Sequence, residues 1–465
     1  MPRRPSYPLP ARFVEGAGGL TLQEQVFRTL RDAIAGGRLA AGSRLPSSRA
    51  FADEQGLARQ TVTVAYERLA AEGFVETRRG AGTFVAGSLP ARAVRSGAGA
   101  PRPSRRLAQL LSAPPRRGLG QPLALKPGVP ALDLFPATLW KRLLQRAFQG
   151  GGADLLDYGD PAGLPALRQA IADYVGAVRG IAARPEQVIV TAGAQGAAFA
   201  AALAVADPGE IALVETPGYT TLQAALRLAG LVLRPLPVDE AGCDIARAPA
   251  AAEARVALVS PSHHYPLGVT LTLERRLALL AWAKQVGGTI LEDDYDGEYR
   301  FDQPQVTALH SLESGARVIY LGTLSKLLAP GLRLGFLVVP EALVEGVSAI
   351  RGLLDRHLAL PLQAALADFI GNGHLAAHIR KVRPLYAERR AALAAALEQD
   401  CGGLLRVSGA AAGLHLLGRL PPGSDDRAIA AEANAAGLGV AALSSFFLAG
   451  RPGPADRGLV LGFST

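Results

Sequence analysis

The sequence LGTLSKLLAPGLRLGF (Leu321–Phe336) surrounds Lys326, one of five lysines in a chain of 465 residues that has 44 arginines. Small, hydroxyl-bearing and apolar residues flank this amine, and Arg333 follows it closely. Burying an amine costs free energy unless the amine is paired, neutral or covalently used. The segment therefore raises the question of what the Lys326 amine is used for.

The composition is that of a globular protein with more than one domain. A chain of 465 residues exceeds what one hydrophobic core supports, and 49% hydrophobic against 19% charged residues suits well-buried domains. Two cysteines are too few for a disulfide framework. Four prolines within the first ten residues interrupt the apolar core that a signal peptide needs. We expect a soluble, cytoplasmic protein without membrane association.

The positive charge is concentrated at the N-terminal end. Residues 1–120 contain 19 arginines, no lysine and 8 acidic residues, which gives +11, whereas the remainder has 30 basic and 32 acidic residues, which gives −2. This asymmetry favours a polyanion-binding head on a near-neutral body. A basic tail without a specific partner is the alternative that charge alone leaves open.

Residues 1–86 show the pattern of a helix-turn-helix domain. Thr21 and Glu24 form a capping signal before a helix with an apolar residue at every fourth position, and a Gly-Gly pair ends it. Ser47 is the predicted N-cap of a short second helix. A third helix follows within residues 57–73 and exposes polar residues near its start. Such an arrangement is typical of helix-turn-helix DNA-binding geometry.

A predicted wing completes the head, because two β-prone runs flank the sequence RRGAG (78–82). Residues 20–85 resemble the winged-helix domain of the GntR family, through RLPSSRAFA, LARQTVTVAYERLAAEGFVE and RRGAGTFV. The positions that match DNA-contacting residues of that family are Arg49, Arg59, Thr61 and Gly80. Thr63 stands where some members have an arginine, so we expect one contact to be weaker or absent.

Residues 87–122 form a predicted linker between this head and the body, residues 123–465. The segment has seven arginines, no acidic residue and many prolines and glycines. This composition is typical of a flexible tether. Two interpretations are open for its arginines, which add nonspecific DNA affinity in one and only solubility in the other.

The body alternates helical stretches with seven candidate strands, QVIVTAG, EIALVET, LVLRPLPV, RVALVSP, GTILEDD, VIYLGT and RLGFLVV. Continuous apolar strands separated by helices predict a buried, mainly parallel α/β sheet. Ligands of such sheets bind beyond the carboxyl ends of the strands. The residues near these ends that could bind a ligand are Ala194, Gln195, Tyr219, Asp293, Tyr295, Thr323, Lys326 and Arg333.

One cofactor matches these residues, because pyridoxal 5′-phosphate (PLP) combines an aldehyde, a ring nitrogen, a phenolic oxygen, a flat ring and a phosphate. The body resembles the fold-type-I aminotransferases over nearly its whole length, most specifically in SKLLAPGLRLG. The resemblance implies that Lys326 forms a Schiff base with PLP, that Asp293 keeps the ring nitrogen protonated and that Tyr295 donates to the phenolic oxygen. It also implies that Tyr219 stacks on the ring. The implied phosphate-binding residues are Arg333, Thr323, Ala194 and Gln195.

The whole chain resembles the MocR family of bacterial transcriptional regulators, in which a GntR-like head precedes an aminotransferase-like body. SPSHHYPLGVTLTLERRLALLAWA and LEDDYDGEYRF are similar to that family's versions of these segments. The expected fold is a mainly parallel, seven-stranded fold-type-I body with a smaller C-terminal α+β subdomain, plus the winged helix-turn-helix. The resemblance implies a head-to-tail homodimer that binds double-stranded operator DNA and a small-molecule effector, without a metal. It also suggests that His263 and Tyr265 line the pocket.

Transamination needs a cation for the carboxylate of the substrate. Aligning GLVLGFST with the R-L-x-F segment of aminotransferases puts Val460 at the usual arginine, and Thr221 replaces a second arginine of an amino-acid-sensing member. A buried carboxylate without a charged partner is costly, so we expect little or no transaminase turnover. The arginines that could substitute are Arg300, Arg451 and Arg457.

Three functions are compatible with these features. The first is a PLP-dependent, DNA-binding regulator that senses PLP or a PLP-reactive amino compound and controls vitamin B6, amine or amino-acid metabolism. The second is an active PLP-dependent aminotransferase with an accessory DNA-binding domain. The third is a DNA-binding protein whose body binds no cofactor.

Overall fold

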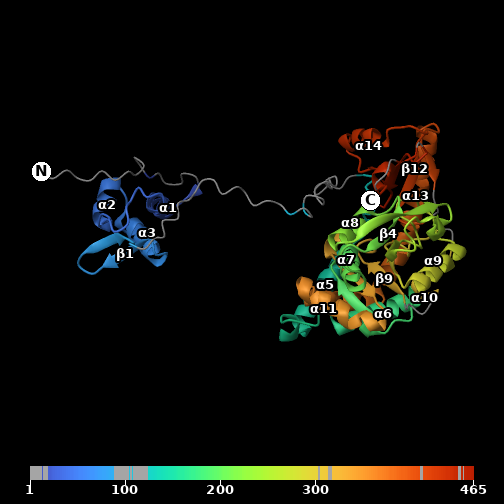
Figure 1. The fold of residues 1–465 in the computed structure, drawn as a ribbon, viewed down its shortest axis with the longest axis horizontal. Helices are drawn as coiled ribbons and strands as arrows, with labels where there is room; N and C mark the ends of the chain where they lie inside the picture. Colours follow the sequence, from blue (N-terminus) through green and yellow to red (C-terminus); the bar gives the residue numbers. More distant parts are fainter. Residues whose placement is uncertain are drawn as a thin grey trace. The chain divides into compact units, whose positions relative to one another are not determined.

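A computed structural model describes residues 13, 19–87, 104, 107, 124–301, 304–312, 317–408, 412–448, 452–453 and 455–464. The chain forms two compact units, Met1–Ser104 and Arg105–Thr465, called the head and the body below (Figure 1). The predicted linker, residues 87–122, lies almost wholly outside the described residues. Every helix in the described part of the chain is too short or too polar to cross a bilayer.

The head combines three helices with a two-stranded hairpin. Its elements are α1 (Leu22–Ala35), α2 (Ser48–Gln55), α3 (Arg59–Ala71), β1 (Val75–Arg78) and β2 (Gly82–Val85). The two strands pair antiparallel. The predicted winged helix-turn-helix is thereby confirmed.

The predicted capping residues begin the first two helices. Thr21 Oγ1 accepts a hydrogen bond from Glu24 N (3.3 Å), and Ser47 Oγ accepts one from Ala50 N (3.1 Å). Each bond satisfies an amide that has no partner inside its helix. The Glu24 carboxylate accepts a hydrogen bond from Arg68, which links α1 to α3.

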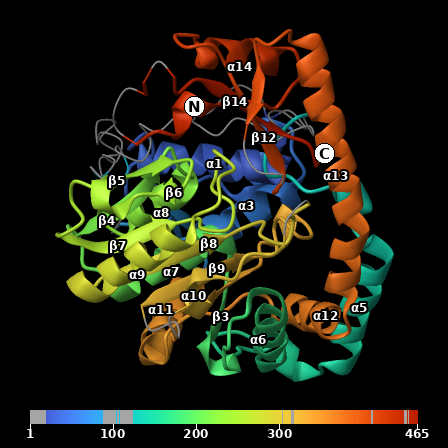
Figure 2. The same ribbon diagram turned by 90° about the vertical axis from the view of Figure 1, so that its right-hand side faces the viewer.

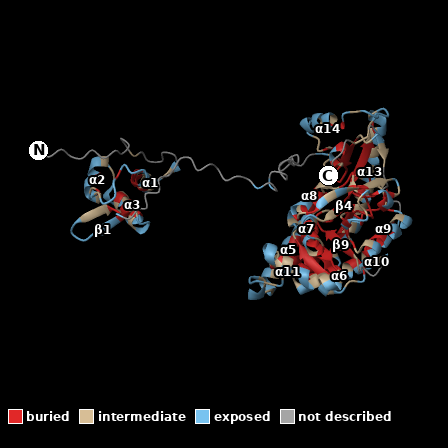
Figure 3. Ribbon diagram, in the orientation of Figure 1, coloured by how far each residue is buried: buried red, intermediate tan, exposed pale blue. Residues whose placement is uncertain are grey.

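The head has its own apolar core between the three helices. Phe27 and Leu30 of α1, Phe51 of α2, and Val62 and Leu69 of α3 are all buried in one cluster. Figure 3 shows this buried centre in red, with an exposed outer surface. The four-residue apolar spacing noted in the sequence therefore marks the inner face of α1.

Eight strands form a mixed sheet in the described part of the body, in the order β3-β10-β9-β8-β7-β4-β5-β6. Strand β10 is antiparallel to β3 and β9, β6 is antiparallel to β5, and the other pairs are parallel. The seven predicted strands are present, and the two-residue β6 is additional. Their bounds are β3 (Val188–Thr191), β4 (Ile211–Thr216), β5 (Val232–Asp239), β6 (Gly242–Cys243), β7 (Ala254–Val259), β8 (Thr289–Asp294), β9 (Val318–Thr323) and β10 (Gly335–Val338).

Helices cover both faces of this sheet, so successive side chains of a strand enter different cores. In β3, Val188 and Val190 pack with α5, α6, α12 and α13, whereas Ile189 packs with α7, α8 and α11. Helix α9 covers the remaining strands of the first face. The bounds are α5 (Ala137–Gly150), α6 (Pro165–Arg179), α7 (Gly193–Val205), α8 (Thr220–Leu228), α9 (Leu273–Val286), α10 (Leu309–Leu312), α11 (Val344–Asp355), α12 (Leu360–Gly371) and α13 (His374–Asp400).

A smaller α+β subdomain follows at the C-terminal end, as predicted. Its four described strands have the order β11-β12-β14-β13 and pair antiparallel. Figure 2 shows α13 extending from α12, beside the large sheet, to this small sheet. The bounds are β11 (Arg406–Ser408), β12 (His415–Arg419), α14 (Asp426–Ala435), β13 (Ala441–Ala442) and β14 (Gly458–Gly462).

Candidate functional site

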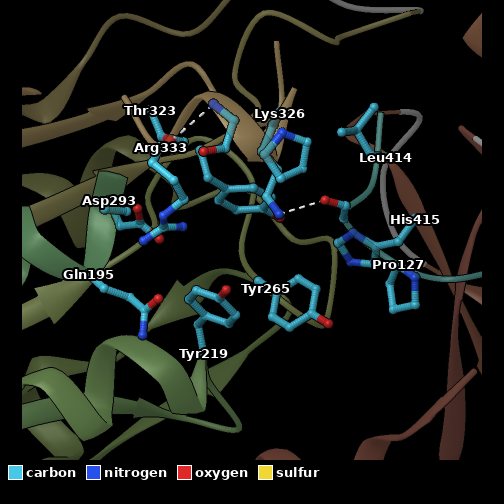
Figure 4. Close-up of a pocket in the computed structure, with 15 residues that line it drawn as sticks. Pro127, Gln195, Tyr219, Tyr265, Asp293, Thr323, Lys326, Arg333, Leu414 and His415 are labelled. Atoms are coloured by element: carbon cyan, nitrogen blue, oxygen red, sulfur yellow. Dashed lines mark hydrogen bonds between the residues drawn. The ribbon is translucent and has the colours of Figure 1, made fainter. Parts of the chain in front are cut away.

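A cavity of about 220 Å³ lies at the carboxyl ends of the parallel strands, next to the small sheet (Figure 4). All eight residues that the sequence suggested for PLP binding line it. The complete lining is Pro127, Gly128, Ala194, Gln195, Tyr219, Tyr265, Asp293, Tyr295, Thr323, Ser325, Lys326, Pro330, Arg333, Leu414 and His415. The structure thus brings together residues that are distant in the sequence.

Lys326 lies in the segment that follows β9 and is half-buried. Its Nζ donates a hydrogen bond to the carbonyl oxygen of Gly128 (2.6 Å). Gly128 itself has a left-handed φ of +75° and approaches the amine closely. The amine therefore projects into the cavity with one hydrogen bond to a neutral acceptor, which suits a group that reacts with a carbonyl compound.

Arg333 faces the N-terminal end of α7, where backbone amides lack partners inside the helix. Its Nη2 donates to the carbonyl oxygen of Ala192 (3.1 Å). Gly193 has a φ of +73°, and a Cβ atom there would lie 3.5 Å from the guanidinium. Ala194 and Gln195 begin the same helix, so a guanidinium and free amides adjoin one space, which is the donor set that binds a phosphate.

Thr323, the last residue of β9, adds a hydroxyl to this group. Its Oγ1 accepts a hydrogen bond from Ser325 N (3.2 Å), which leaves the hydroxyl hydrogen to donate. Figure 4 shows Thr323, Arg333 and Lys326 around one end of the cavity.

Asp293 is the buried acid of the site. It lies on β8 with 3% of its surface exposed, and its Oδ1 has no hydrogen-bond partner among the described residues. Burial, together with Asp294 and Asp296, raises the pKa of Asp293 to about 8, and only Lys326 opposes this rise. An orphaned carboxyl oxygen beside a cavity is suited to a ligand that brings a donor or a positive charge.

Tyr295 contacts a His-Asp pair behind the cavity wall. Its hydroxyl lies 3.0 Å from His263 Nδ1, and that nitrogen lies 3.1 Å from both carboxylate oxygens of Asp296. Burial and the charge of Asp296 raise the pKa of Tyr295 well above its usual range, so the phenol keeps its proton. His263 was expected at the pocket wall, but the structure places it one layer behind Tyr295.

His263, Asp296 and His415 are close enough to suggest a metal site, since one ligand atom of each lies within 4.8 Å of the others. The backbone of Gly413 fills the adjoining space, because a Cβ atom there would lie 2.5 Å from Asp296 Oδ2. His263 Nδ1 already donates to the Asp296 carboxylate (3.1 Å). We therefore interpret the cluster as a support for Tyr295.

Aromatic rings form the far wall of the cavity. Tyr265 packs edge-on against Tyr219 (5.4 Å between centroids), Phe446 (5.2 Å) and His415 (4.9 Å). His415 Nε2 donates to the carbonyl oxygen of Pro266 (3.2 Å), and burial lowers the pKa of His415 well below its usual range. The sequence suggested Tyr265, but His415 was missed because it lies inside an apolar run of β12.

The expected carboxylate anchors do not line the cavity. Val460 is buried in β14 between Leu417 and Ala441, and Thr221 is buried in α8. Among the described residues of the cavity wall, Lys326 and Arg333 are the only cationic side chains other than histidine.

Two of the three candidate substitutes also lie elsewhere. Arg300 donates to Ser262 O (3.0 Å) and Thr270 Oγ1 (3.2 Å), and Arg457 donates to Asp456 O (3.4 Å). Arg451 lies outside the described residues. The described wall therefore offers a substrate carboxylate no cation beyond those suited to PLP.

The head presents the residues that match DNA contacts on its surface. Arg49 near the start of α2, Arg59 at the start of α3 and Gly80 in the wing are exposed, and Thr61 is half-buried. Gly80 has a φ of +74°, which permits the tight turn between β1 and β2. Thr63 Oγ1 donates to the carbonyl oxygen of Arg59 (3.0 Å) and so stays within α3. These positions suit a helix and a wing that meet DNA.

The fold and this site define a class of protein, an aminotransferase-like body joined to a winged-helix head. Residues 127–450 match the family "Aminotransferase class I and II", and residues 22–85 match "Bacterial regulatory proteins, gntR family". The chain belongs to the MocR-type transcriptional regulators, which combine these two parts. Such an aminotransferase fold is typically PLP-dependent, and the GntR-type head implies DNA binding.

Several regulators are similar along nearly the whole chain. A probable rhizopine catabolism regulatory protein MocR of Rhizobium meliloti is 38% identical over 95% of this chain and 90% of its own length. The regulator TauR of Rhodobacter capsulatus is 36% identical, over 84% and 83%. The pyridoxine biosynthesis regulator PdxR of Corynebacterium glutamicum is 32% identical, over 96% and 92%.

Solved aminotransferases share the fold of the body. The α-aminoadipate aminotransferase LysN of Thermus thermophilus, in complex with N-(5′-phosphopyridoxyl)-L-leucine, is 26% identical with a TM-score of 0.66, over 78% of this chain and 90% of its own. The kynurenine aminotransferase of Pyrococcus horikoshii has a TM-score of 0.67 over the same shares at 24% identity, which supports the fold alone.

Proposed function

We propose that this protein is a DNA-binding transcriptional regulator that holds PLP on Lys326 and changes its affinity for an operator according to what occupies the cavity. One observation carries the proposal. The eight residues that PLP requires line one cavity in a chain whose other unit is a winged helix. A regulator of this kind acts on bacterial DNA in the cytoplasm.

The described residues fit the cofactor group by group. Asp293 offers an orphaned buried oxygen to the ring nitrogen, and Tyr295 offers a phenol that keeps its proton. Arg333, with the amides that begin α7, suits the phosphate, and Tyr219 suits the flat face of the ring. Bound there, PLP would supply a reactive aldehyde to the Lys326 amine.

The effector is PLP itself or an amino compound that reacts with it. To invert a 1:99 equilibrium between two conformations, a ligand must bind one of them about 10⁴-fold more tightly. We propose that covalent attachment at Lys326 and phosphate capture at Arg333 are made fully in only one of the two conformations and so supply this difference. We further propose that the protein is a head-to-tail homodimer, in which two heads bind two half-sites of double-stranded DNA.

The test compares Lys326→Ala with Lys284→Ala, which removes an exposed lysine of α9 instead. We expect Lys326→Ala to lose the visible absorbance of the bound cofactor, and to bind operator DNA with an affinity that no longer responds to added PLP. Lys284→Ala should match the wild type in both assays. Cofactor-responsive DNA binding by Lys326→Ala would contradict the proposal.

An active aminotransferase is the second candidate, because the residues suited to the cofactor and its lysine are complete in the cavity. Mixing the PLP-loaded protein with a panel of amino acids distinguishes the two. We expect slow, at most single-turnover conversion to pyridoxamine phosphate, since the described wall has no further cation for a carboxylate. Fast multiple turnover would favour the enzyme. A protein that stays colourless with added PLP would instead favour a body without cofactor.

A further inference from the structure

A second, much smaller cavity of about 10 Å³ lies on the other side of Asp293. Asp293 and Tyr219 line both cavities, so the buried acid separates the large cavity from the small one. The other polar residues of the small cavity are Glu215, Ser260 and Gln223. None of these three lines the large cavity, so the proposed function has not used them.

Glu215 is fixed in the wall of this small cavity. It lies near the end of β4 with 6% of its surface exposed. Its Oε2 accepts a hydrogen bond from Ser260 N (3.0 Å), and its backbone carbonyl accepts one from Gln223 Nε2 (3.2 Å). These bonds fix a second buried carboxyl group on the small cavity, which Asp293 also lines.

No cation compensates for the buried Glu215 among the described residues around it. His264 Nε2 lies 3.5 Å from Glu215 Oε2, but His264 Nδ1 accepts a hydrogen bond from Leu267 N (3.4 Å), so the ring is neutral with its proton on Nε2. Burial lowers the pKa of His264 to about 3. Burial, and secondarily the charge of Asp293, raises the pKa of Glu215 to about 8. Glu215 is therefore a carboxylic acid at neutral pH.

The other titratable groups near this pair come from neighbouring elements. Asp294 and Asp296 act on Asp293 from β8 and the segment after it, and Lys326 acts from beyond β9. The thiol of Cys243, on β6, has a pKa raised by burial and by Glu215, so it is uncharged as well. Among these groups, only Lys326 lowers the pKa of Asp293, and Lys326 lines the large cavity.

The small cavity has the size and polarity to hold one water molecule. A site of about 10–15 Å³ with two to four polar partners is enough to hold a buried water. The carboxyl groups of Glu215 and Asp293 and the polar side chains of Ser260 and Gln223 supply those partners. A water here would give the Asp293 carboxyl group a hydrogen-bond donor on the side of the small cavity.

We propose that Glu215 is a positioning residue that acts on Asp293 through this buried water. The protonated carboxyl of Glu215 donates its O–H to the water, and the water donates to the carboxylate of Asp293. The relay rests on the proposed function, because its role is to stabilise the Asp293 carboxylate that holds a protonated ring nitrogen. Glu215 thereby stabilises a negative charge without adding a second one.

The test uses the full chain loaded with PLP and three variants. Glu215→Gln keeps a donor and an acceptor at this site, whereas Glu215→Leu removes both. Glu292→Gln is the matched control, since Glu292 is also a buried glutamate, lies on β8, accepts from Leu309 N (2.7 Å) and His310 N (2.8 Å) and lines neither cavity. Urea unfolding establishes that each variant is folded. The readout is the pH midpoint of the visible absorbance change of the bound cofactor.

We expect Glu215→Leu to raise that midpoint by about one pH unit, a tenfold change in proton affinity. A ring nitrogen that loses its proton no longer repels a proton on the Lys326 nitrogen. Glu215→Gln and Glu292→Gln should stay within about 0.3 pH unit of the wild type, a twofold change. The proposal is overturned if Glu215→Leu leaves the midpoint unchanged, or if Glu215→Gln shifts it equally.

A second measurement applies if Glu215→Leu does not fold. The infrared difference spectrum between the wild-type and Glu215→Gln apoproteins should contain the band of a protonated carboxyl, and its absence overturns the relay. A wild-type protein that gains no visible absorbance with PLP defeats the proposed function and the relay together. If the wild-type protein gains visible absorbance with PLP and the pH midpoint of Glu215→Leu is unchanged, only the relay is defeated.

Discussion

Gly413 determines, at the scale of a single residue, how closely the chain packs behind the cavity. Its φ of +71° is in the left-handed region, and a Cβ atom would overlap the ring of His263 and lie 2.5 Å from Asp296 Oδ2. These two side chains support Tyr295. A side chain at Gly413 therefore cannot be added without displacing His263 or Asp296, which support the cavity wall at Tyr295.

Gly413→Ala tests this packing against Gly423→Ala, whose glycine has a similar φ of +85° but no heavy atom within 4 Å of the added Cβ. The control should lose only the cost of a left-handed alanine, about 1–2 kcal/mol. Gly413→Ala should lose about 2–5 kcal/mol, since overpacking adds about 1–3 kcal/mol. Urea unfolding measures the loss in free energy of unfolding of both variants. Equal losses would show that the side chains around Gly413 can move aside at little cost.

At the scale of elements, α3 is the helix that GntR-type geometry places in the major groove. Its first residue, Arg59, is exposed, while its inner face buries Val62 and Leu69. The polar start and the apolar stripe are thus separate features of one helix. Substituting a polar residue at the start of α3 should weaken DNA binding and leave folding intact.

Arg59→Ala should weaken operator binding and lower the slope of log affinity against log salt by about 0.9, the value for one phosphate contact. Arg31→Ala is the control, because Arg31 lies on α1 and pairs with Asp32 (2.8 Å). Fluorescence anisotropy over a range of salt concentrations gives both slopes. A slope for Arg59→Ala that matches the wild type would remove this residue from the DNA interface.

The elements of the body were predictable to different degrees. Long apolar runs marked seven strands, because buried strands are continuous in hydrophobicity. The two-residue β6 (Gly242–Cys243) has no such run, and the antiparallel direction of β10 leaves no trace in composition. Residues at strand ends, such as Lys326, could be found from sequence. His415 and Glu215 could not, since each lies within an apolar strand and meets the site only through tertiary packing.

At the scale of the whole molecule, buried acids should make the apoprotein less stable as pH rises. Burial raises the pKa of Asp293 and Glu215 to about 8, and of Glu292 and Glu298 to about 7. At pH values between the ordinary pKa of these acids and the raised pKa, the unfolded chain has released protons that the folded chain still holds. The free energy of unfolding therefore falls as pH rises through this range. Histidines with lowered pKa, such as His264, destabilise the fold only below their ordinary value of 6.5.

The free energy of unfolding of the apoprotein should therefore fall from pH 6.5 to pH 8, by up to about 1.4 kcal/mol per pH unit for each proton. Asp293→Asn removes one of these protons, so the decline should become shallower by up to about 1.4 kcal/mol per pH unit. Asp154→Asn, at an exposed position, should leave the slope unchanged. Urea unfolding at several pH values measures the slope. A decline in Asp293→Asn as steep as in the wild type would mean that Asp293 ionises freely in the fold.

The self-contained core of the head has an evolutionary consequence. The buried residues of this described cluster run from Val26 to Val85, and all of them belong to the head. Recombination that exchanges this unit would change the DNA sequence that the protein binds and leave the aminotransferase-like body unchanged. A new DNA specificity can thus arise by exchange of one compact N-terminal unit, Met1–Ser104.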